Sequence, residues 1–366
     1  MLDPNSPLPK YQQLKEHIKN QIRKGLLQVN EQLPTENTLA EQYQLSRQTV
    51  RQALSELEVE GWLSRQQGRG TFVTERALKQ SRTVAVIIKS ISNYIFPDII
   101  RGLENVLSRA GYEIKLYLSQ DDPELEAKHL KKVLQGDDIS GVILEPANNL
   151  APCAHRDLLL ELEQKRIPYL LIHSTWPELD APHIMIDDFM GGYLATEYLL
   201  QLGHRKIAGI FNIDSRQGVD RQAGFKKAME DHGVEINPKF IGEYRYNAMH
   251  DTFPCQFTRD FMMRPDRPTA IFCYNDLDAI RSMEAIRLMG LKVPDDVSII
   301  GYNDSILATV SEVRLTSVKH PKRDFGAETA HLIINMMENT IEKPKLLIQP
   351  ELIIRSSCRN VGNNDQ

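Results

Sequence analysis

The chain has 366 residues, and at about 150 residues per domain this length predicts two or three structural units. Its 44 Lys and Arg against 49 Asp and Glu give a net charge of −5, and 41% of the residues are hydrophobic. This composition excludes a wholly disordered chain and a uniformly basic coat for nucleic acid. The charge is unevenly divided, because residues 1–82 carry a net +3 and residues 83–366 a net −8. The division is compatible with a small basic module attached to an acidic body.

The start of the chain lacks the features of an export signal. Residues 1–7 contain an acid and two prolines and no apolar stretch, which argues against a secretory signal. The longest apolar runs, such as Val84 to Ile88, are far shorter than the roughly 20 residues that span a bilayer. The 4 cysteines are scattered without a CxxC pair, as expected in a reducing compartment. We therefore expect a cytoplasmic protein with no metal and no cofactor.

The N-terminal segment has the spacing of three helices. A first helix is predicted over Lys10–Lys24, a short second one from its N-cap Thr35 to Tyr43, and a third that is capped by Ser46. The positions expected to be buried are Tyr11, Leu14, Ile18, Ile22, Leu39, Ala40, Tyr43, Val50, Ala53, Leu54 and Leu57. The opposite face of the third helix carries Arg47, Gln48, Arg51 and Ser55. Two helices joined by a short turn, the second with Arg and Gln outward, predict a helix-turn-helix.

Two short β segments follow and flank the turn Gly68-Arg69-Gly70, which predicts a hairpin with Arg69 at its tip. Together with Leu33–Asn37, Ser46–Leu54 and Gly61–Leu63, this hairpin closely resembles the winged-helix DNA-binding domain of the GntR family. The resemblance covers residues 8–75 almost continuously. We assign residues 1–75 to this domain and the polar residues 76–82 to a linker.

This resemblance implies a DNA-contact surface on the third helix and the hairpin, or wing. Arg can donate two hydrogen bonds to guanine and Gln to adenine, and a glycine-flanked Arg can enter the minor groove. Glu36 is unusual near phosphates: it could accept from a cytosine, hold Arg47 or Arg51, or only favour its helix N-terminus through the helix dipole. The expected DNA-binding residues are Lys10, Tyr11, Glu36, Ser46, Arg47, Gln48, Thr49, Arg51, Gln67, Gly68, Arg69 and Gly70.

From residue 83 to residue 366, apolar strand-like runs alternate with segments of helical spacing. The runs are Val84–Lys89, Glu113–Leu118, Gly141–Leu144, Tyr169–Ile172, His183–Ile186, Lys206–Asn212, Ala270–Tyr274 and Val297–Tyr302. Such alternation predicts an α/β fold with parallel sheets covered by helices on both faces. The segment is too long for one doubly wound sheet of ordinary size, so two lobes are expected.

Several segments of this body, taken in chain order, are similar to the LacI/GalR regulatory domain, which itself resembles periplasmic sugar-binding proteins. They are Phe96–Glu104, Tyr198–Ala208, Asp220–Phe225, Cys273–Asp276 and Val297–Asp304. The similarity implies an effector-binding and dimerisation domain over residues 83–366, with the ligand between two lobes at the carboxyl ends of strands. A GntR-type module joined to such a body resembles the arabinose repressors of Gram-positive bacteria, which implies L-arabinose as the effector. Another pentose, a hexose or a non-sugar effector is the alternative.

Sugars need planar polar groups for their hydroxyls and aromatic faces for their C–H surfaces. On the family pattern, the expected effector-binding residues are Lys89, Tyr94, Phe96, Glu145, His173, Arg221, Tyr246, Asn275, Asn303 and His320. Plainer interpretations compete: His173 and His320 as core or surface histidines, Arg221 as an ion pair within a lobe, Asn275 as a helix cap. Asn303 and His173 stand where relatives often carry Asp, which argues against a wholly hexose-type site.

Other functional classes fit less well. The sequence has no GxGxxG after a strand and no Walker-type loop, HExxH or GxSxG, so an enzyme is not expected. An exported sugar-binding protein would fit the body alone, but not the winged helix. The expected function is therefore a sugar-responsive transcriptional repressor that binds double-stranded operator DNA as a homodimer.

Overall fold

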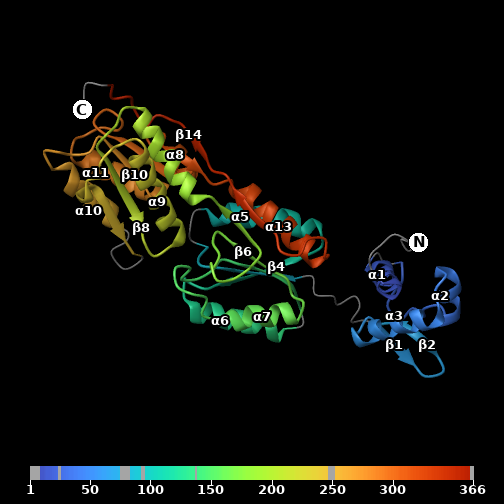
Figure 1. Ribbon diagram of the computed structural model, residues 1–366. Coiled ribbons are helices and arrows are strands. Elements are labelled where there is room, and N and C mark those ends of the chain that lie inside the picture. The colour runs from blue at the N-terminus through green and yellow to red at the C-terminus, as the bar shows by residue number, and fades with distance from the viewer. Residues whose placement is uncertain are drawn as a thin grey trace. The chain divides into compact units, whose positions relative to one another are not determined.

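The computed structural model describes residues 9–23, 26–74, 83–91, 95–136, 138–245 and 252–362. The chain forms two compact units, Met1–Arg82 and Thr83–Gln366 (Figure 1). The predicted linker at residues 76–82 falls outside the described residues.

The first unit is a winged helix-turn-helix. Its elements are α1 (Lys10–Arg23), α2 (Glu36–Tyr43), α3 (Arg47–Val59), β1 (Leu63–Gln66) and β2 (Gly70–Val73), and the two strands form an antiparallel hairpin. Both predicted N-caps are confirmed, because the side chain of Thr35 accepts from the Thr38 N–H and that of Ser46 from the Thr49 N–H. These caps fix the start of each helix and hence the turn between α2 and α3.

One core holds this unit together. The buried residues of α1, α3 and β1 pack against one another, and Trp62 closes the cluster. The predicted stripe is confirmed at Leu14, Ile18 and Ile22, each at most 1% exposed. Tyr11 and Tyr43, which we expected to be buried, are only half-buried, because both lie at the edge of the core. The ring of Tyr43 lies 5.2 Å from that of His17.

The second unit consists of two lobes, each built on a six-stranded sheet (Figure 1). The first sheet has the order β13-β7-β6-β5-β3-β4 and all of its pairs are parallel. Its strands are β3 (Thr83–Ile88), β4 (Glu113–Leu118), β5 (Ile139–Leu144), β6 (Tyr169–Ile172), β7 (His183–Ile186) and β13 (Lys345–Ile348). The helices of this lobe are α5 (Phe96–Arg109), α6 (Pro123–Gln135), α7 (Arg156–Gln164) and α13 (Lys322–Met337).

The second sheet has the order β14-β12-β11-β10-β8-β9, and only β14 runs antiparallel to its neighbour. Its strands are β8 (Ile207–Asn212), β9 (Ile241–Tyr244), β10 (Ala270–Cys273), β11 (Ser298–Asn303), β12 (Thr316–Lys319) and β14 (Glu351–Ile353). The helices of this lobe are α8 (Asp188–Gln201), α9 (Arg216–Asp231), α10 (Phe253–Met262), α11 (Asp276–Leu288) and α12 (Ile306–Val310), and a 3-10 turn spans Pro238–Phe240. The predicted two-lobed α/β architecture is confirmed.

The chain passes between the two lobes three times, after β7, after β12 and after β13. The late elements α13 and β13 therefore complete the first lobe. Helix α13 lies directly on α5, where a Cβ on Gly102 would come within 2.2 Å of the carbonyl oxygen of Arg323, and one on Gly326 within 2.1 Å of that of Ile99. Only glycine permits this close approach of the two helices.

His204 ties four segments of the second lobe together. Its Nδ1 lies 2.8 Å from Thr269 Oγ1, and its Nε2 lies 3.0 Å from Ser298 Oγ and 3.1 Å from the carbonyl oxygen of Arg359. The ring is 1% exposed. Burial disfavours the imidazolium and lowers the pKa of His204 to about 4.

We expect this histidine to make stability depend on pH. The unfolded chain binds a proton near pH 6.5 and the folded chain only near pH 4, so the contribution of His204 is complete above pH 6.5 and is lost as the pH falls toward 4. The loss amounts to about 3 kcal/mol at most. Urea unfolding across this range measures it, with His204→Asn as the comparison. The variant should show a shallower pH dependence, and equal slopes would contradict the assignment.

Candidate functional site

The predicted DNA-contact residues lie on the surface of the first unit. The exposed ones are Lys10, Ser46, Arg47, Gln48, Arg51, Gln67, Gly68 and Arg69, and the half-buried ones are Tyr11, Glu36, Thr49 and Gly70. Most of the set thus belongs to the first turns of α3 and to the tip of the hairpin. These are the elements that enter the two grooves in winged-helix recognition.

The tip of the wing depends on its two glycines. Gly68 has φ +75° and Gly70 has φ +119°, a region that side chains rarely adopt. The Arg69 N–H donates to the carbonyl of Gln66 at 3.0 Å, and the Arg69 carbonyl accepts from Gln32 Nε2 at 2.8 Å. The backbone of the turn is thereby held, and the Arg69 side chain is presented to solvent.

Glu36 holds two arginines. Its Oε2 accepts from Nε and Nη2 of Arg51, at 3.1 and 3.0 Å, and its Oε1 accepts from Nη2 of Arg65 at 3.1 Å. Of the roles considered for Glu36, orientation of Arg51 is the one that these contacts support. The predicted set of DNA-binding residues does not include Arg65 on β1. An outward-facing Arg on the first strand of the wing was the signal that could have added it.

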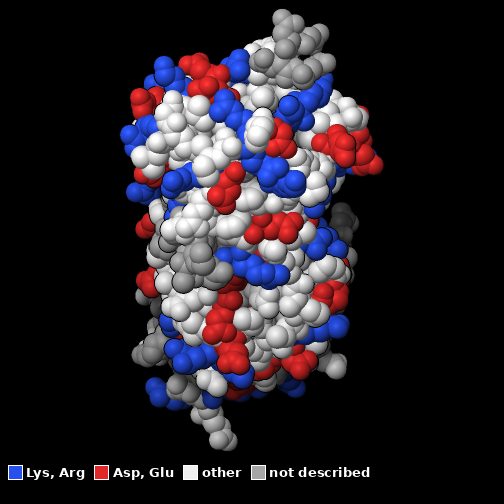
Figure 2. Space-filling model, turned by 90° about the vertical axis from the view of Figure 1, so that its left-hand side faces the viewer, with Lys and Arg blue, Asp and Glu red and all other residues white. Residues whose placement is uncertain are grey.

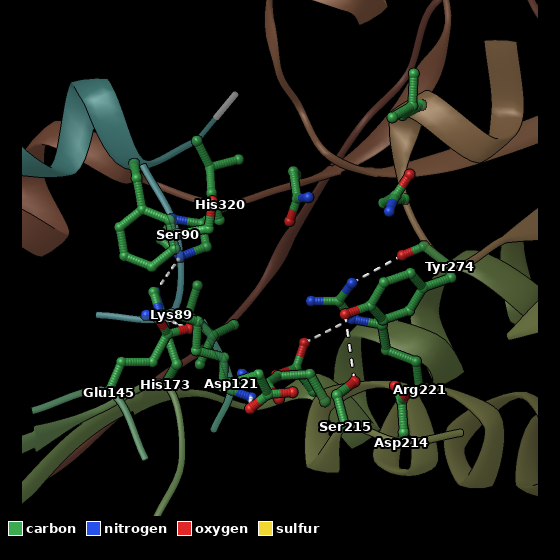
Figure 3. Close-up of a pocket in the computed structure, with 18 of the residues that line it drawn as sticks. Lys89, Ser90, Asp121, Glu145, His173, Asp214, Ser215, Arg221, Tyr274 and His320 are labelled. Atoms are coloured by element: carbon green, nitrogen blue, oxygen red, sulfur yellow. Dashed lines mark hydrogen bonds and ion pairs between the residues drawn. The ribbon is translucent and has the colours of Figure 1, made fainter. Parts of the chain in front are cut away.

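The second unit contains a cavity of about 570 Å³ lined by residues from both lobes (Figure 3). Eight of the ten predicted effector-binding residues line it: Lys89, Phe96, Glu145, His173, Arg221, Asn275, Asn303 and His320. Tyr94 and Tyr246 fall outside the described residues. Most of the eight follow the carboxyl end of a strand, as the topology of parallel sheets requires.

A charged cluster forms the first-lobe wall of the cavity. The side-chain Nζ of Lys89 lies 2.9 Å from Asp121 Oδ1. The main-chain N–H of Lys89 donates to Glu145 Oε2 at 2.9 Å. Burial acts to raise the pKa of Glu145, but His173 and the Lys89 ammonium outweigh it and lower this pKa. Burial likewise acts to lower the pKa of Lys89, and Glu145 and Asp121 raise it overall. Both groups are therefore charged at neutral pH.

Two histidines connect this wall to the segment after β12, where the chain passes between the lobes. His173 Nδ1 lies 3.5 Å from Glu145 Oε1, and its Nε2 lies 3.1 Å from His320 Nε2 (Figure 3). Burial, together with His173, Lys322 and Arg221, holds the pKa of His320 well below its ordinary value, so His320 is neutral. The second ring nitrogen of His320 is Nδ1. This atom is buried and has no partner among the described residues.

Arg221 occupies the second-lobe wall. Its Nε donates to Asp188 Oδ1 at 2.8 Å and its Nη1 to the carbonyl of Tyr274 at 2.7 Å. The guanidinium carbon also lies 3.5 Å from the ring centroid of Tyr302. Burial acts to lower the pKa of Arg221, and Asp188 raises it overall. Arg221 is therefore both a lobe-stabilising ion pair and a lining residue, and the two interpretations that competed are compatible.

Two asparagines combine structural and lining roles. Asn275 caps α11, since its Oδ1 accepts from the Asp278 N–H at 2.9 Å, and it also lines the cavity. Asn303 ends β11 with φ 100°. The lining residues that we did not predict include Ser90, Gln120, Asp121, Asp188, Asp214, Ser215, Gln217 and Tyr274. Asp188 could have been found because it follows the predicted strand His183–Ile186, whereas Asp214, Ser215 and Gln217 lie around the start of α9.

Among the described residues, no group of three or more His, Cys, Asp or Glu side chains is placed to hold a metal ion. In the same part of the chain, every helix is too short or too polar to span a bilayer. Figure 2 shows one face of the molecule on which Lys and Arg are interspersed with Asp and Glu. That face offers no continuous basic area of the kind that binds nucleic acid.

Known proteins resemble both units. Residues 10–73 match the bacterial regulatory proteins of the gntR family, and residues 196–358 match a periplasmic binding protein-like domain. The chain is 41% identical over 361 residues to the arabinose metabolism transcriptional repressor of Geobacillus stearothermophilus, covering 97% of this chain and 99% of that protein. It is 37% identical over 361 residues to a protein of the same name from Halalkalibacterium halodurans, covering 95% and 96%. The crystal structure of the transcription regulator CcpA of Lactococcus lactis matches 76% of this chain and 99% of that chain, with a TM-score of 0.65 and 25% identity.

We expect Arg51→Ala to weaken binding to a specific DNA site by about 1–3 kcal/mol and to relax one base preference, because a base contact is lost. Titration against a set of single-base variants of the site measures both effects. Lys10→Ala is the control: we expect Lys10, at the edge of the unit, to contact phosphate, and loss of such a contact weakens all sequences alike. Uniform weakening by Arg51→Ala would instead identify Arg51 as a phosphate contact.

The pairing of Glu36 with Arg51 is tested by a double-mutant cycle. Glu36→Gln removes the charge that holds Arg51 and keeps the size of the side chain, so it should relax the same base preference. The two substitutions together should cost less than the sum of their separate effects, because both remove one interaction. Strict additivity would show that Glu36 acts independently of Arg51.

Proposed function

Because the chain belongs to the family of arabinose metabolism transcriptional repressors, we propose that it represses sugar-utilisation genes and leaves its operator when L-arabinose binds between the lobes of its second unit. The observation that carries this proposal is the cavity, in which polar groups from strand ends of both lobes converge. A cavity lined by a few placed polar groups and by Phe96 suits a small polyhydroxylated ligand.

One atom of this cavity lacks the partner that buried polar groups normally have. His320 is 4% exposed, and its Nδ1 has no partner among the described residues. A sugar hydroxyl, which can both donate and accept, would satisfy this atom. The Glu145–His173–His320 chain fixes the ring that would make this bond, so the site is organised before the ligand arrives.

The charges of the cavity favour a neutral ligand. The Lys and Arg side chains that line it in the described part of the chain are already paired, Lys89 with Asp121 at 2.9 Å and Arg221 with Asp188 at 2.8 Å. Further carboxylates line the cavity at Glu145 and Asp214. A phosphorylated sugar would bring its negative charge against these carboxylates without an available cation, which is unfavourable in a buried site.

We further propose that two copies pair through their second units and present two winged helices to a pseudo-palindromic operator. The recognition helix would read the major groove with Arg47, Gln48 and Arg51, and the wing would reach the minor groove with Gln67 and Arg69. Lobe closure on the sugar would change the spacing of the two winged helices. A repressor of this kind acts on chromosomal DNA, so we propose a cytoplasmic location and assign no catalytic step.

Calorimetry of the full chain with L-arabinose, other pentoses and hexoses tests the effector. We expect saturable binding of L-arabinose and release of operator DNA over the same concentration range. Operator must weaken sugar binding by the factor by which sugar weakens operator binding, with a coupling of about 1–3 kcal/mol. Equal sugar affinity with and without operator would contradict this mechanism, and a failure of every sugar would point to a different class of effector.

The neutral-ligand proposal is tested by a phosphorylated pentose. We expect it to bind about a hundredfold or more weakly than L-arabinose, because the carboxylates repel it. A neutral sugar derivative as large as the phosphorylated pentose is the control, because it needs the same space without the charge. Binding of the phosphorylated sugar as tight as that of L-arabinose would contradict the charge argument.

A further inference from the structure

Asn149 joins the two lobes at a place beside the cavity. It lies in the segment between β5 and α7 of the first lobe and is 2% exposed. Its Nδ2 donates to Ser174 Oγ at 2.9 Å within the first lobe and to Gln217 Oε1 at 3.3 Å in the second lobe. Its Oδ1 accepts from the Arg216 N–H at 2.8 Å, also in the second lobe. One buried side chain thus makes two hydrogen bonds across the junction.

The start of α9 explains why an amide is suited to this position. The first N–H groups of a helix have no acceptor within the helix. Ser215 Oγ accepts from the Gly218 N–H at 3.2 Å, and Asn149 supplies the acceptor for Arg216 from the other lobe. At the same time Gln217 Oε1 requires a donor. An apolar side chain meets neither need. A carboxylate meets the first, and it meets the second only if the Gln217 amide turns over so that its Nε2 donates, whereas an asparagine meets both as Gln217 stands.

The segment that carries Asn149 is also tied to the wall of the cavity. The Asn148 N–H donates to Asp121 Oδ1 at 2.9 Å, and Lys89 Nζ lies 2.9 Å from the same oxygen. The neighbouring Ala147 N–H donates to Glu126 Oε2 at 2.7 Å. Across the junction, Gln217 both accepts from Asn149 and lines the cavity. Two residues that line the cavity therefore flank Asn149, Asp121 through the neighbouring Asn148 and Gln217 by direct contact.

We propose that Asn149 is a clasp that holds the two lobes closed around the ligand and so sets sugar affinity without contacting the sugar. Apparent affinity depends on the fraction of molecules in the binding-competent arrangement, and two hydrogen bonds across the junction raise that fraction. The clasp mainly slows dissociation of the sugar, because the lobes must separate before the sugar leaves. This inference rests on the proposed function, since it places the sugar between the lobes.

The test compares full-length variants. Asn149→Ala should bind L-arabinose about tenfold more weakly, because two hydrogen bonds of ordinary strength are lost, and its sugar dissociation rate should rise by a similar factor. Its affinity for operator DNA without sugar should be at least that of the wild type, because the open lobes are the proposed DNA-binding arrangement, and operator release should need correspondingly more sugar. Asn149→Asp retains the acceptor for Arg216 and should lie between the two. Leu150→Ala, at a neighbour 41% exposed, is the control and should behave as the wild type.

The outcomes separate the clasp from the proposed function. Wild-type affinity and dissociation rate in Asn149→Ala would overturn the clasp and leave the proposed function intact. If Asn149→Ala does not fold, Asn149→Leu decides, because leucine keeps the size of the side chain and removes both hydrogen bonds across the junction. A wild-type dissociation rate in that variant overturns the clasp. If the wild type binds no sugar, the proposed function fails, and small-angle X-ray scattering then decides: a larger radius of gyration for Asn149→Ala supports the clasp, and an unchanged one contradicts it.

Discussion

Paired charges beside the cavity organise the second unit, and the two partners of each pair come from different segments of the chain. Arg221 from α9 meets Asp188 at the start of α8, and Lys89 after β3 meets Asp121 after β4. An isolated charge would be costly in such surroundings, because burial removes its hydration. The pairs therefore fix the relative positions of the elements that carry them. A cavity with polar walls is the consequence, since the same groups that need partners also face the space between the lobes.

The first unit follows a different rule, because its important charges are exposed. Glu36 forms ion pairs with Arg51 and Arg65 on the surface, where each pair contributes little to stability. Its effect is to restrict two long side chains, which then lose less conformational freedom on meeting DNA. The net +3 of residues 1–82 is small for a protein that binds a polyanion. Affinity must then depend on well-placed contacts more than on overall charge.

Local features of the sequence predicted most of the elements and few of the contacts. Apolar runs and caps such as Ser46 act within a few residues, so strands, helix starts and the two-lobed fold could be predicted. Strands β9, β12, β13 and β14 were missed. In β12 the reason is that Thr316 and Ser317 are polar, although both are buried by neighbouring elements. The site residues at strand ends followed from family resemblance and topology. Glu36 and Arg65 are 29 positions apart in the sequence. The contacts of Asn149 across the junction join residues 67 and 68 positions apart. No periodicity of the sequence reveals contacts at such separations.

The late return of the chain to the first lobe has a consequence for biosynthesis. Residues 83–186 leave the ribosome early but lack α13 and the edge strand β13, which pairs with β7 only after residue 345 has been made. The glycine-lined contact between α5 and α13 spans more than 200 residues for the same reason. Contacts this distant in sequence form slowly, because a long loop must close first. The winged helix can therefore be complete, and ready to meet DNA, before either lobe of the sensor exists.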